Sequence, residues 1–317
     1  MIKILVIDDH APDGVSFWRN IEPFSVLRKQ FPGEVFIENA NERVSVHDIK
    51  QFDVVVMFRP VKPESLKFIK NCRALGLRVI LDIDDDLWNL PYYHPSFMDY
   101  ERFKATARDI YEAADVIWTS TEQLRYVIGD LSKTEVMPNA VLPQWLPDQP
   151  SEYKGRAAWI GSAGLQYDLN STHAQKWFEE WQEQYRQWLF FGYRPEIASG
   201  PNCTGVPYGF VYEFFESIVN AGLNVVWKPL RDLPFNQSKS NIAWLTATMA
   251  GAVCVTNFSG REGWECALPE FTTDPDEIRA QFHRSRNVIL QNYNLLTVNE
   301  RRLESIKSLL TGKKTTA

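Results

Sequence analysis

Short apolar runs alternate with helical hydrophobic patterns along the chain, and this alternation limits the possible folds more than any other feature. Residues 2–7 form an apolar run that ends at Asp8, as a buried parallel strand does. Further strands are expected at residues 35–38, 54–58, 78–83, 116–120 and 135–137, and helices at residues 17–31, 64–75 and 100–114. Strands that alternate with helices form parallel βαβ units. We therefore expect a Rossmann-like domain over residues 1–140.

A proline-rich segment separates this pattern from a second one. Residues 137–150 contain four prolines, which remove backbone donors and stiffen the chain, so we expect an interdomain linker at residues 141–151. Strands are then expected at residues 157–160, 188–191, 225–228 and 252–256, and helices at residues 172–184, 211–221, 240–250 and 295–310. The pattern predicts a second Rossmann-like domain over residues 152–285. Ligands of such open sheets bind at the carboxyl ends of the strands, here in a cleft between the two domains.

The composition excludes several classes of protein. Hydrophobic residues make up 44 % of the 317 residues and charged residues 23 %, as in a globular protein with a core. The sequence has no long apolar stretch and opens on a strand-like run, which predicts neither membrane insertion nor a signal peptide. The four cysteines follow no metal-ligand or redox spacing, so we expect a reduced, cytoplasmic protein.

The distribution of charge disfavours a nucleic-acid partner without excluding a local basic patch. The net charge is −6, and residues 80–150 alone carry five Lys and Arg against 13 Asp and Glu. A nucleic-acid-binding protein usually presents a basic face, and no long basic run is present here.

The first residues also resemble the opening of a two-component receiver domain. Residues 3–10 match that pattern, but the family needs a phospho-acceptor aspartate at the end of its third strand. Phe58 occupies that position, and the domain is too long for a receiver. We therefore set the receiver interpretation aside.

The segment from Lys228 to Val255 carries the strongest local signal in the second half. It has the pattern of a strand, a loop, a helix, a glycine and another strand. Ser238 and Ser240 are N-cap candidates, and Lys239 adds positive charge beside the free N–H groups of the first turn. Such a helix start is a ready phosphate site. A plain serine-capped helix with a solvated lysine is the alternative interpretation.

This segment resembles the nucleotide-sugar site of GT-B glycosyltransferases, in particular the family-four-like group and its phage and bacterial relatives. Five further segments match that group in order and spacing, so that the resemblance covers roughly residues 1–300. They are Gly14-Val-Ser-Phe-Trp-Arg-Asn-Ile-Glu-Pro23, Asp82-Ile-Asp-Asp-Asp-Leu-Trp-Asn-Leu-Pro91, residues 114–124, Met137-Pro-Asn-Ala140 and Trp159-Ile-Gly-Ser-Ala-Gly-Leu-Gln-Tyr-Asp-Leu169. The resemblance implies the fold class α/β, GT-B: two Rossmann-like domains facing each other across a cleft. It also implies that residues 286–317 form a C-terminal helix crossing back toward the first domain, followed by a disordered tail.

The function implied by the resemblance is transfer of a hexosyl or pentosyl group from a nucleotide sugar to a hydroxyl acceptor. A UDP-sugar is the expected donor, and no metal is obligatory. Because some phage enzymes of this fold glycosylate hydroxymethylated bases, modified DNA in a host cytoplasm is one expected acceptor. The target base would then leave the stack to reach the site.

The resemblance also implies where the donor binds. Its diphosphate is expected at residues 238–241, its ribose near Thr246 and its base around Leu230 and Phe235. The full set of expected donor-binding residues is Gly161, Ser162, Lys228, Leu230, Phe235, Asn236, Ser238, Lys239, Ser240, Asn241 and Thr246.

Three consecutive aspartates are the expected catalytic residues. Asp84, Asp85 and Asp86 form the densest carboxylate cluster, and crowded carboxylates raise one another's pKa toward the range of a general base. The expected acceptor-binding residues are Gly14, Arg19 and His94. For Arg19 a surface ion pair, and for His94 a structural role, are the alternatives.

The chain departs from the family pattern at two places. Ser238 and Thr246 stand where family-four enzymes usually carry two glutamates, and a hydroxyl binds ribose without charge assistance. Residues 161–169 lack the usual arginine and lysine, so Lys228, Arg231 and Lys239 would supply the positive charge. These departures keep open an alternative function, a catalytically degenerate GT-B protein that binds a nucleotide or a partner.

Overall fold

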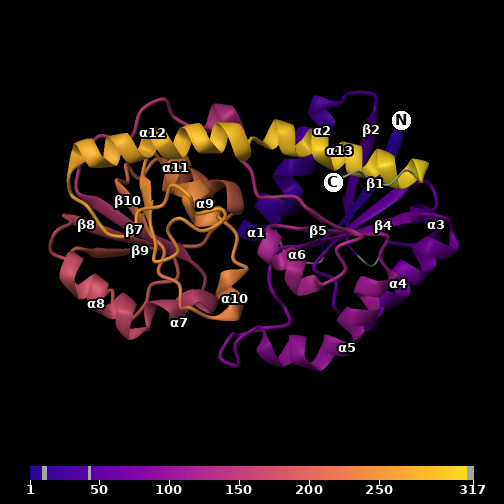
Figure 1. Cartoon of the computed structure of the whole chain (residues 1–317), viewed down its shortest axis with the longest axis horizontal. Helices are drawn as coiled ribbons and strands as arrows, with labels where there is room; N and C mark the ends of the chain where they lie inside the picture. The colour runs from indigo at the N-terminus through magenta and orange to yellow at the C-terminus, as the bar shows by residue number, and fades with distance from the viewer. Residues whose placement is uncertain (9–12, 42–43, 313–317) are drawn as a thin grey trace.

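The computed structural model describes residues 1–8, 13–41 and 44–312, and it contains two parallel β-sheets, one on each side of the proline-rich segment (Figure 1). The first sheet has the order β2-β1-β3-β4-β5-β6. Its strands are β1 (Ile2–Ile7), β2 (Val35–Ala40), β3 (Val54–Phe58), β4 (Arg78–Ile83), β5 (Val116–Thr119) and β6 (Thr134–Val136). Every residue of β3 is buried, because helices cover both faces of the sheet.

Helices pack on both faces of the first sheet. They are α1 (Gly14–Ser16), α2 (Glu22–Gln30), α3 (Val46–Ile49), α4 (Pro63–Ala74), α5 (Phe97–Ala113) and α6 (Glu122–Ile128), and a π-helical segment (Phe17–Ile21) joins α1 to α2. Phe24 and Leu27 of α2 pack on one face, and Ile69 of α4 and Ile110 of α5 pack on the other.

The second sheet has the order β11-β10-β7-β8-β9, also with all strands parallel. Its strands are β7 (Arg156–Gly161), β8 (Gln187–Gly192), β9 (Cys203–Pro207), β10 (Val225–Trp227) and β11 (Val253–Val255). The accompanying helices are α7 (Gln166–Leu169), α8 (Thr172–Trp181), α9 (Val211–Val219), α10 (Pro234–Gln237) and α11 (Ile242–Met249). The edge strand β9 was not expected from the sequence.

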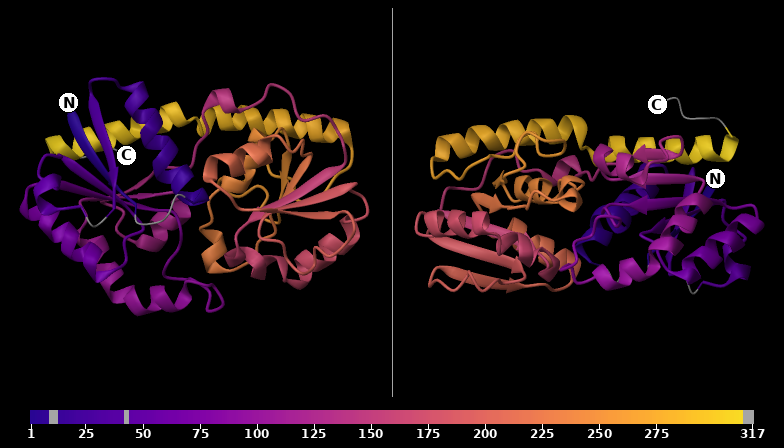
Figure 2. Two further views of the ribbon diagram at one scale, coloured as in Figure 1. Left: turned by 180° about the vertical axis from the view of Figure 1, so that it is seen from behind. Right: turned by 60° about the horizontal axis from the view of Figure 1, so that its bottom comes forward.

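Two long helices at the end of the chain connect the halves. α12 (Pro275–Asn292) packs on the second sheet through Phe282, and α13 (Leu295–Thr311) packs on the first through Leu303 and Ile306. Both views in Figure 2 show this yellow pair running along one side of the molecule. The expected boundary between residues 285 and 286 falls inside α12, and the end of the expected disordered tail, residues 313–317, lies outside the described residues.

Aromatic side chains also join the two halves. Phe17, in the π-helical segment of the first half, stacks on Phe215 of α9 with ring centroids 4.4 Å apart. Trp18 packs edge-on against the same ring. These contacts place the carboxyl ends of the two sheets on either side of one junction.

Candidate functional site

The candidate site lies where the strand order of each sheet reverses. The first sheet reverses between β1 and β3, and the second between β7 and β10. Ligands of open α/β sheets bind at such switch points, beyond the carboxyl ends of the strands. Arg59 directly follows β3, and Lys228 directly follows β10. Lys239 Nζ, from the second half, lies 2.6 Å from Asp85 Oδ1, so the residues at the two sheet edges meet.

Arg59 organises two of the three expected catalytic aspartates. Its Nε donates to Asp84, and its Nη2 donates to Asp85 Oδ2 over 2.7 Å. The backbone of Arg59 has a φ of +45°, a left-handed conformation that side chains rarely adopt. Strain of this kind concentrates at functional sites. The sequence analysis missed Arg59, although its place at the carboxyl end of β3 was a usable signal.

The surroundings of Asp84 and Asp85 separate their pKa values. Burial raises the pKa of Asp84, and the charge of Arg59 only partly offsets that effect. Burial also favours the neutral form of Asp85, but Lys239 and Arg59 outweigh it and lower its pKa. Two carboxylates whose environments separate their pKa values can take different roles in acid–base chemistry. Of the two carboxylates, Asp84 therefore holds a proton more tightly than Asp85 does.

Asp86 does not share this chemistry. Its carboxylate accepts hydrogen bonds from the backbone N–H groups of Trp88 and Asn89 and from the Asn89 side-chain amide. It therefore stabilises the turn after β4, and its expected catalytic role stays a prediction.

Lys228 is a buried cation without a partner. Its residue is 9 % exposed, and burial lowers its pKa from 10.5 to about 8, although Asp168 acts in the opposite direction. Within the described residues its ammonium group makes no hydrogen bond or ion pair, and it lies 6.0 Å from the centre of the Trp159 ring. Burying an unpaired charge is costly. The switch point of the second sheet thus holds a positive charge suited to an anion.

The loop before α11 carries further polar groups without partners. Ser238 Oγ, Asn241 Nδ2 and Asn236 Oδ1 are buried and, among the described residues, make no hydrogen bond. Asp168, which the sequence analysis missed, fixes this loop by accepting from Asn236 Nδ2 at 2.8 Å and from the Arg231 N–H at 3.0 Å. These polar groups are therefore buried beside a backbone that Asp168 holds in place.

The N-cap predictions for Ser238 and Ser240 are wrong. α11 begins at Ile242 with Asn241 as its N-cap, and no side-chain hydrogen bond caps it. Ser238 instead ends α10, and its carbonyl oxygen accepts a hydrogen bond from Thr121 in the first half. The short helix α10 shifts the start of α11 toward the C-terminus.

The loop after β7 approaches the first half at His94. A Cβ at Gly161 would lie 2.5 Å from the Trp159 ring, so the strand end needs a glycine. A Cβ at Gly164 would lie 3.1 Å from His94 Nε2, so the loop passes close to this histidine. Ser162, in the same loop, is exposed. Burial lowers the pKa of His94, and its Nδ1 accepts from the Ser96 N–H. The neutral ring therefore carries its proton on Nε2 and presents a donor to the second half.

Two expected binding residues are placed differently from the prediction. Arg19 is 0 % exposed and pairs with Asp82 at 2.6 Å, so it does not reach an acceptor in this structure. Thr246 is 1 % exposed and donates to the Ile242 carbonyl oxygen, which turns its hydroxyl away from a ribose.

Leu230 and Phe235 are largely buried in the second half, and Leu230 contributes to the wall of a cavity there. The Leu230 N–H is bonded to Asn257 Oδ1, and Lys239 Nζ lies 4.2 Å from the centre of the Phe235 ring. Gly14 begins α1, and a Cβ there would meet nothing within 4 Å, so this residue borders open space.

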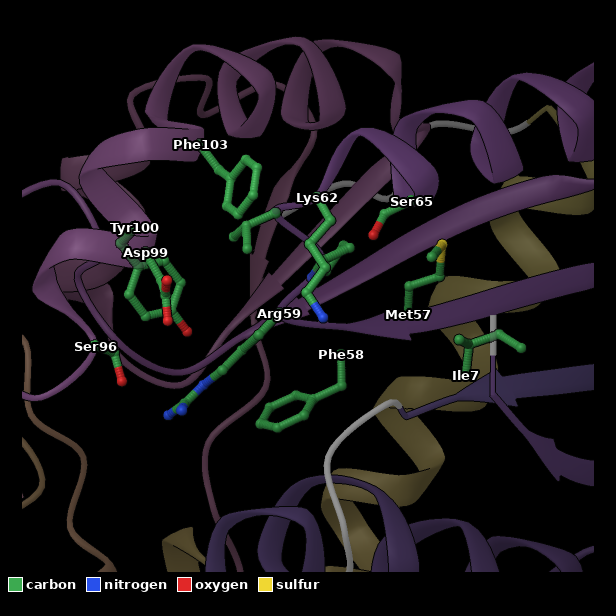
Figure 3. Close-up of a pocket in the computed structure, with 12 residues that line it drawn as sticks. Ile7, Met57, Phe58, Arg59, Lys62, Ser65, Ser96, Asp99, Tyr100 and Phe103 are labelled. Atoms are coloured by element: carbon green, nitrogen blue, oxygen red, sulfur yellow. The ribbon is translucent and has the colours of Figure 1, made fainter. Parts of the chain in front are cut away.

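Two cavities flank the junction, one at each sheet. The cavity at the first sheet has a volume of about 320 Å³ and includes Arg59 and Tyr100 in its wall (Figure 3). The cavity at the second sheet, about 610 Å³, is bounded by residues 171–173, residues 229–232 and Asn257.

The fold is that of GT-B glycosyltransferases, and the predicted fold class is confirmed. Anabaena HepE (Alr3699) in complex with UDP and glucose superposes with a TM-score of 0.62 at 11 % identity, covering 97 % of this chain and 100 % of that chain. Its complex with UDP-glucose gives a TM-score of 0.61 at 10 % identity with the same coverage. A variant of S. aureus TarM, in complex with fondaparinux, alpha-GlcNAc-glycerol and UDP, gives 0.55 at 14 % identity, covering 83 % of this chain and 58 % of that chain. No protein-family model and no curated protein sequence matches the chain.

Among the helices of the described residues, none combines the length and apolar character needed to span a membrane. Within residues 1–8, 13–41 and 44–312, no three His, Cys, Asp or Glu side chains form a group that could hold a metal ion.

Proposed function

We propose that this chain is a glycosyltransferase that moves a sugar from a UDP-sugar to a hydroxyl group. The observation that carries the proposal is Lys228 at the switch point of the second sheet, a largely buried residue whose ammonium group makes no hydrogen bond or ion pair within the described residues. It lies on the opposite side of the junction from the Asp84 and Asp85 pair. The solved complexes of HepE with UDP and with UDP-glucose, on the same fold, support uridine as the nucleotide.

The donor diphosphate is proposed to bind against Lys228 and the loop at residues 238–241. Ser238 Oγ and Asn241 Nδ2, which have no partner within the described residues, would donate hydrogen bonds to phosphate oxygens. Lys239 would exchange Asp85 for a phosphate. The uridine would occupy the cavity of about 610 Å³ beside residues 229–232. This placement keeps the expected position of the base around Leu230 and gives no role to the side chain of Thr246.

The proposed reaction needs only groups of this chain. The bond between C1 of the sugar and the phosphate oxygen breaks, and its electron pair leaves with UDP. Lys228 and Lys239 stabilise the charge that develops on the leaving group. The acceptor oxygen forms the new bond to C1, and its proton goes to Asp84, whose pKa is raised by burial. His94 Nε2 donates from the first half toward the donor.

The family-four-like assignment, in its phage and bacterial branch, is part of this proposal and rests on the ordered sequence segments. A degenerate binding protein is the second candidate. It is favoured by the ion pair between Lys239 and Asp85 and by the inward hydroxyl of Thr246. The two candidates differ in turnover.

Thermal shift and UDP release test the proposal together. The panel comprises UDP, GDP, ADP, CDP, TDP and their common sugar conjugates. We expect a shift with UDP and a UDP-sugar and release of UDP from that sugar nucleotide. Lys228→Met should lose both, whereas Lys176→Met, an exposed change on α8, should lose neither. Binding without UDP release from any donor and acceptor would support the degenerate protein, and the absence of any nucleotide shift would refute both candidates.

A further inference from the structure

The buried face of α13 carries an arginine whose guanidinium group is only partly bonded. Arg302 is 0 % exposed, and its Nη1 donates to Asn299 Oδ1 over 2.9 Å. Within residues 1–8, 13–41 and 44–312, its Nε and Nη2 have no hydrogen-bond partner. These two atoms form one edge of the planar group, and arginine holds anions along such an edge through two parallel N–H donors. Because an unpaired buried charge is costly, we expect a partner beyond the described residues at this edge.

Three further buried polar side chains belong to the same region, where α13 crosses the first half beside α2 (Figure 1). Asp82, on β4, accepts hydrogen bonds from Arg19 Nε and Nη2 at 2.8 and 2.6 Å, both on its Oδ1. Arg19 Nη1 donates to Asn139 Oδ1 at 3.3 Å. Asp82 Oδ2 and Asn139 Nδ2 have no partner among the described residues, and all three side chains are 0 % exposed. Arg19 and Asp82 both act electrostatically on Arg302, so the four residues form one group, the α13 cluster.

The α13 cluster has an excess of positive charge. It contains two arginines and one aspartate, and the single carboxylate already accepts two hydrogen bonds from Arg19. Burial and the charge of Arg19 lower the pKa of Arg302 from 12.5 to about 9, and Asp82 offsets this effect only in part. Arg302 is therefore still charged at neutral pH. One negative charge is needed to balance the cluster.

The unpartnered atoms of the α13 cluster show the same imbalance. In the part of the chain that the structure describes, three donor atoms lack an acceptor, and one acceptor atom lacks a donor: Arg302 Nε, Arg302 Nη2 and Asn139 Nδ2 against Asp82 Oδ2. Unsatisfied buried polar groups in a native fold indicate a bound water molecule or ion. A water molecule would bond to some of these atoms, but it would leave the extra positive charge unbalanced.

We propose that the α13 cluster binds a small monovalent anion between α13 and the first sheet. The anion accepts hydrogen bonds from the free edge of Arg302 and from Asn139 Nδ2. A single negative charge balances the cluster, whereas a divalent anion would exceed the positive charge beside Asp82. A site enclosed by side chains that are 0 % exposed also admits only a small ion. Chloride, nitrate and hydrogencarbonate share this charge and size.

The anion would join the last helix of the chain to the end of a central strand. Asp82 belongs to β4, and the two aspartates at the junction follow it by two and three residues. Arg19 also donates to the Met137 carbonyl oxygen at 2.6 Å, so the same cluster holds the start of the proline-rich segment. This site is separate from Lys228 in the second half, and the inference does not depend on the proposed function.

Thermal unfolding in different sodium salts tests the site. The full chain is dialysed into sodium gluconate, whose anion is too large for the site, and chloride or nitrate then replaces gluconate at constant ionic strength. We expect the Tm to rise and to saturate, by about 5 °C when the small anion exceeds its Kd about a hundredfold. Arg302→Met should lose this rise, whereas Lys307→Met, which removes an exposed cation from the same helix, should keep it. No saturating rise in the unmodified protein, or an equal rise in Arg302→Met, would overturn the inference.

A second measurement needs no variant. Crystals of the unmodified protein are grown in gluconate and soaked in sodium bromide, and anomalous scattering then locates the bromide ions. We expect a peak within hydrogen-bonding distance of Arg302 Nε or Nη2. A water molecule without anomalous signal at this place, or a direct bond from Arg302 to Asp82 Oδ2, would overturn the inference. Bromide found only at surface lysines would show adventitious binding and would overturn it as well.

Discussion

Replacing Lys228 by methionine should stabilise the ligand-free protein, because it removes a buried cation that makes no hydrogen bond or ion pair with the residues that the structure describes. Methionine has a similar length and no charge. Burial lowers the pKa of Lys228 from 10.5 to about 8, so the folded protein holds this proton less tightly than the unfolded chain does. The difference between these two values, at roughly 1.4 kcal/mol per pH unit, amounts to about 3 kcal/mol.

The dependence on pH has a definite sign. Below pH 8 the full penalty acts on the folded state, and it disappears as the pH rises from about 8 to 10.5, because only the unfolded chain is still protonated there. Urea unfolding of the unmodified protein and of Lys228→Met is compared at pH 7 and at pH 9.5. We expect the variant to be more stable by up to about 3 kcal/mol at pH 7 and by less than half of that at pH 9.5.

The same pair of proteins tests the link to the donor. UDP should stabilise the unmodified protein and have little effect on Lys228→Met. Lys176→Met, on the surface of α8, serves as a control in which neither stability nor its response to pH should change. A variant less stable than the unmodified protein at pH 7, by an amount independent of pH, would show that Lys228 has a counter-ion and would refute the reasoning.

Three further substitutions separate the roles of neighbouring residues. Asp85→Asn should tighten UDP binding two- to tenfold, because Lys239 no longer has to leave a carboxylate; weaker binding in calorimetry would contradict this. Asp86→Ala should lower the free energy of unfolding by about 1–3 kcal/mol through lost hydrogen bonds to the turn at Asn89, with kcat retained. Thr246→Val should leave the donor KM within twofold of the original, since its hydroxyl bonds only within its own helix; a tenfold rise would restore the ribose role.

The sequence predicted the central strands well because a strand covered on both faces is a continuous apolar run. The expected strands at residues 54–58 and 78–83 coincide with β3 and β4. The strand β9 was not predicted, because it is an edge strand with mostly exposed residues in a stretch rich in glycine and proline. The helix α12 was not predicted, because its sequence is largely polar and only a narrow stripe of its surface is buried.

At the candidate site the sequence located the segments but not the direction of each side chain. Three adjacent aspartates look alike in sequence. In the fold, the Asp86 side chain hydrogen-bonds to the turn that follows it, whereas Asp84 and Asp85 lie at the junction. The same limit applies to Arg19. Its sequence position is typical of the surface of a helix, but its side chain is buried in an ion pair with Asp82. Contacts that join residues 154 positions apart, such as Lys239 with Asp85, arise only from tertiary structure.

The charges at the junction explain how one site can hold both acids and a diphosphate. Arg59 bonds to both Asp84 and Asp85, Lys239 bonds to Asp85, and Lys228 alone among these groups is without an opposite charge within hydrogen-bonding distance in the described residues. In the proposed reaction an incoming diphosphate therefore meets Lys228 first and competes with Asp85 for Lys239 second. In the first step a phosphate oxygen pairs with Lys228, which has no ion pair within the described residues. In the second step a phosphate oxygen takes the place of the Asp85 carboxylate at Lys239. The negative charge of the donor is therefore balanced as it enters. Departure of UDP would return Lys239 to Asp85, and this exchange would help to release the product.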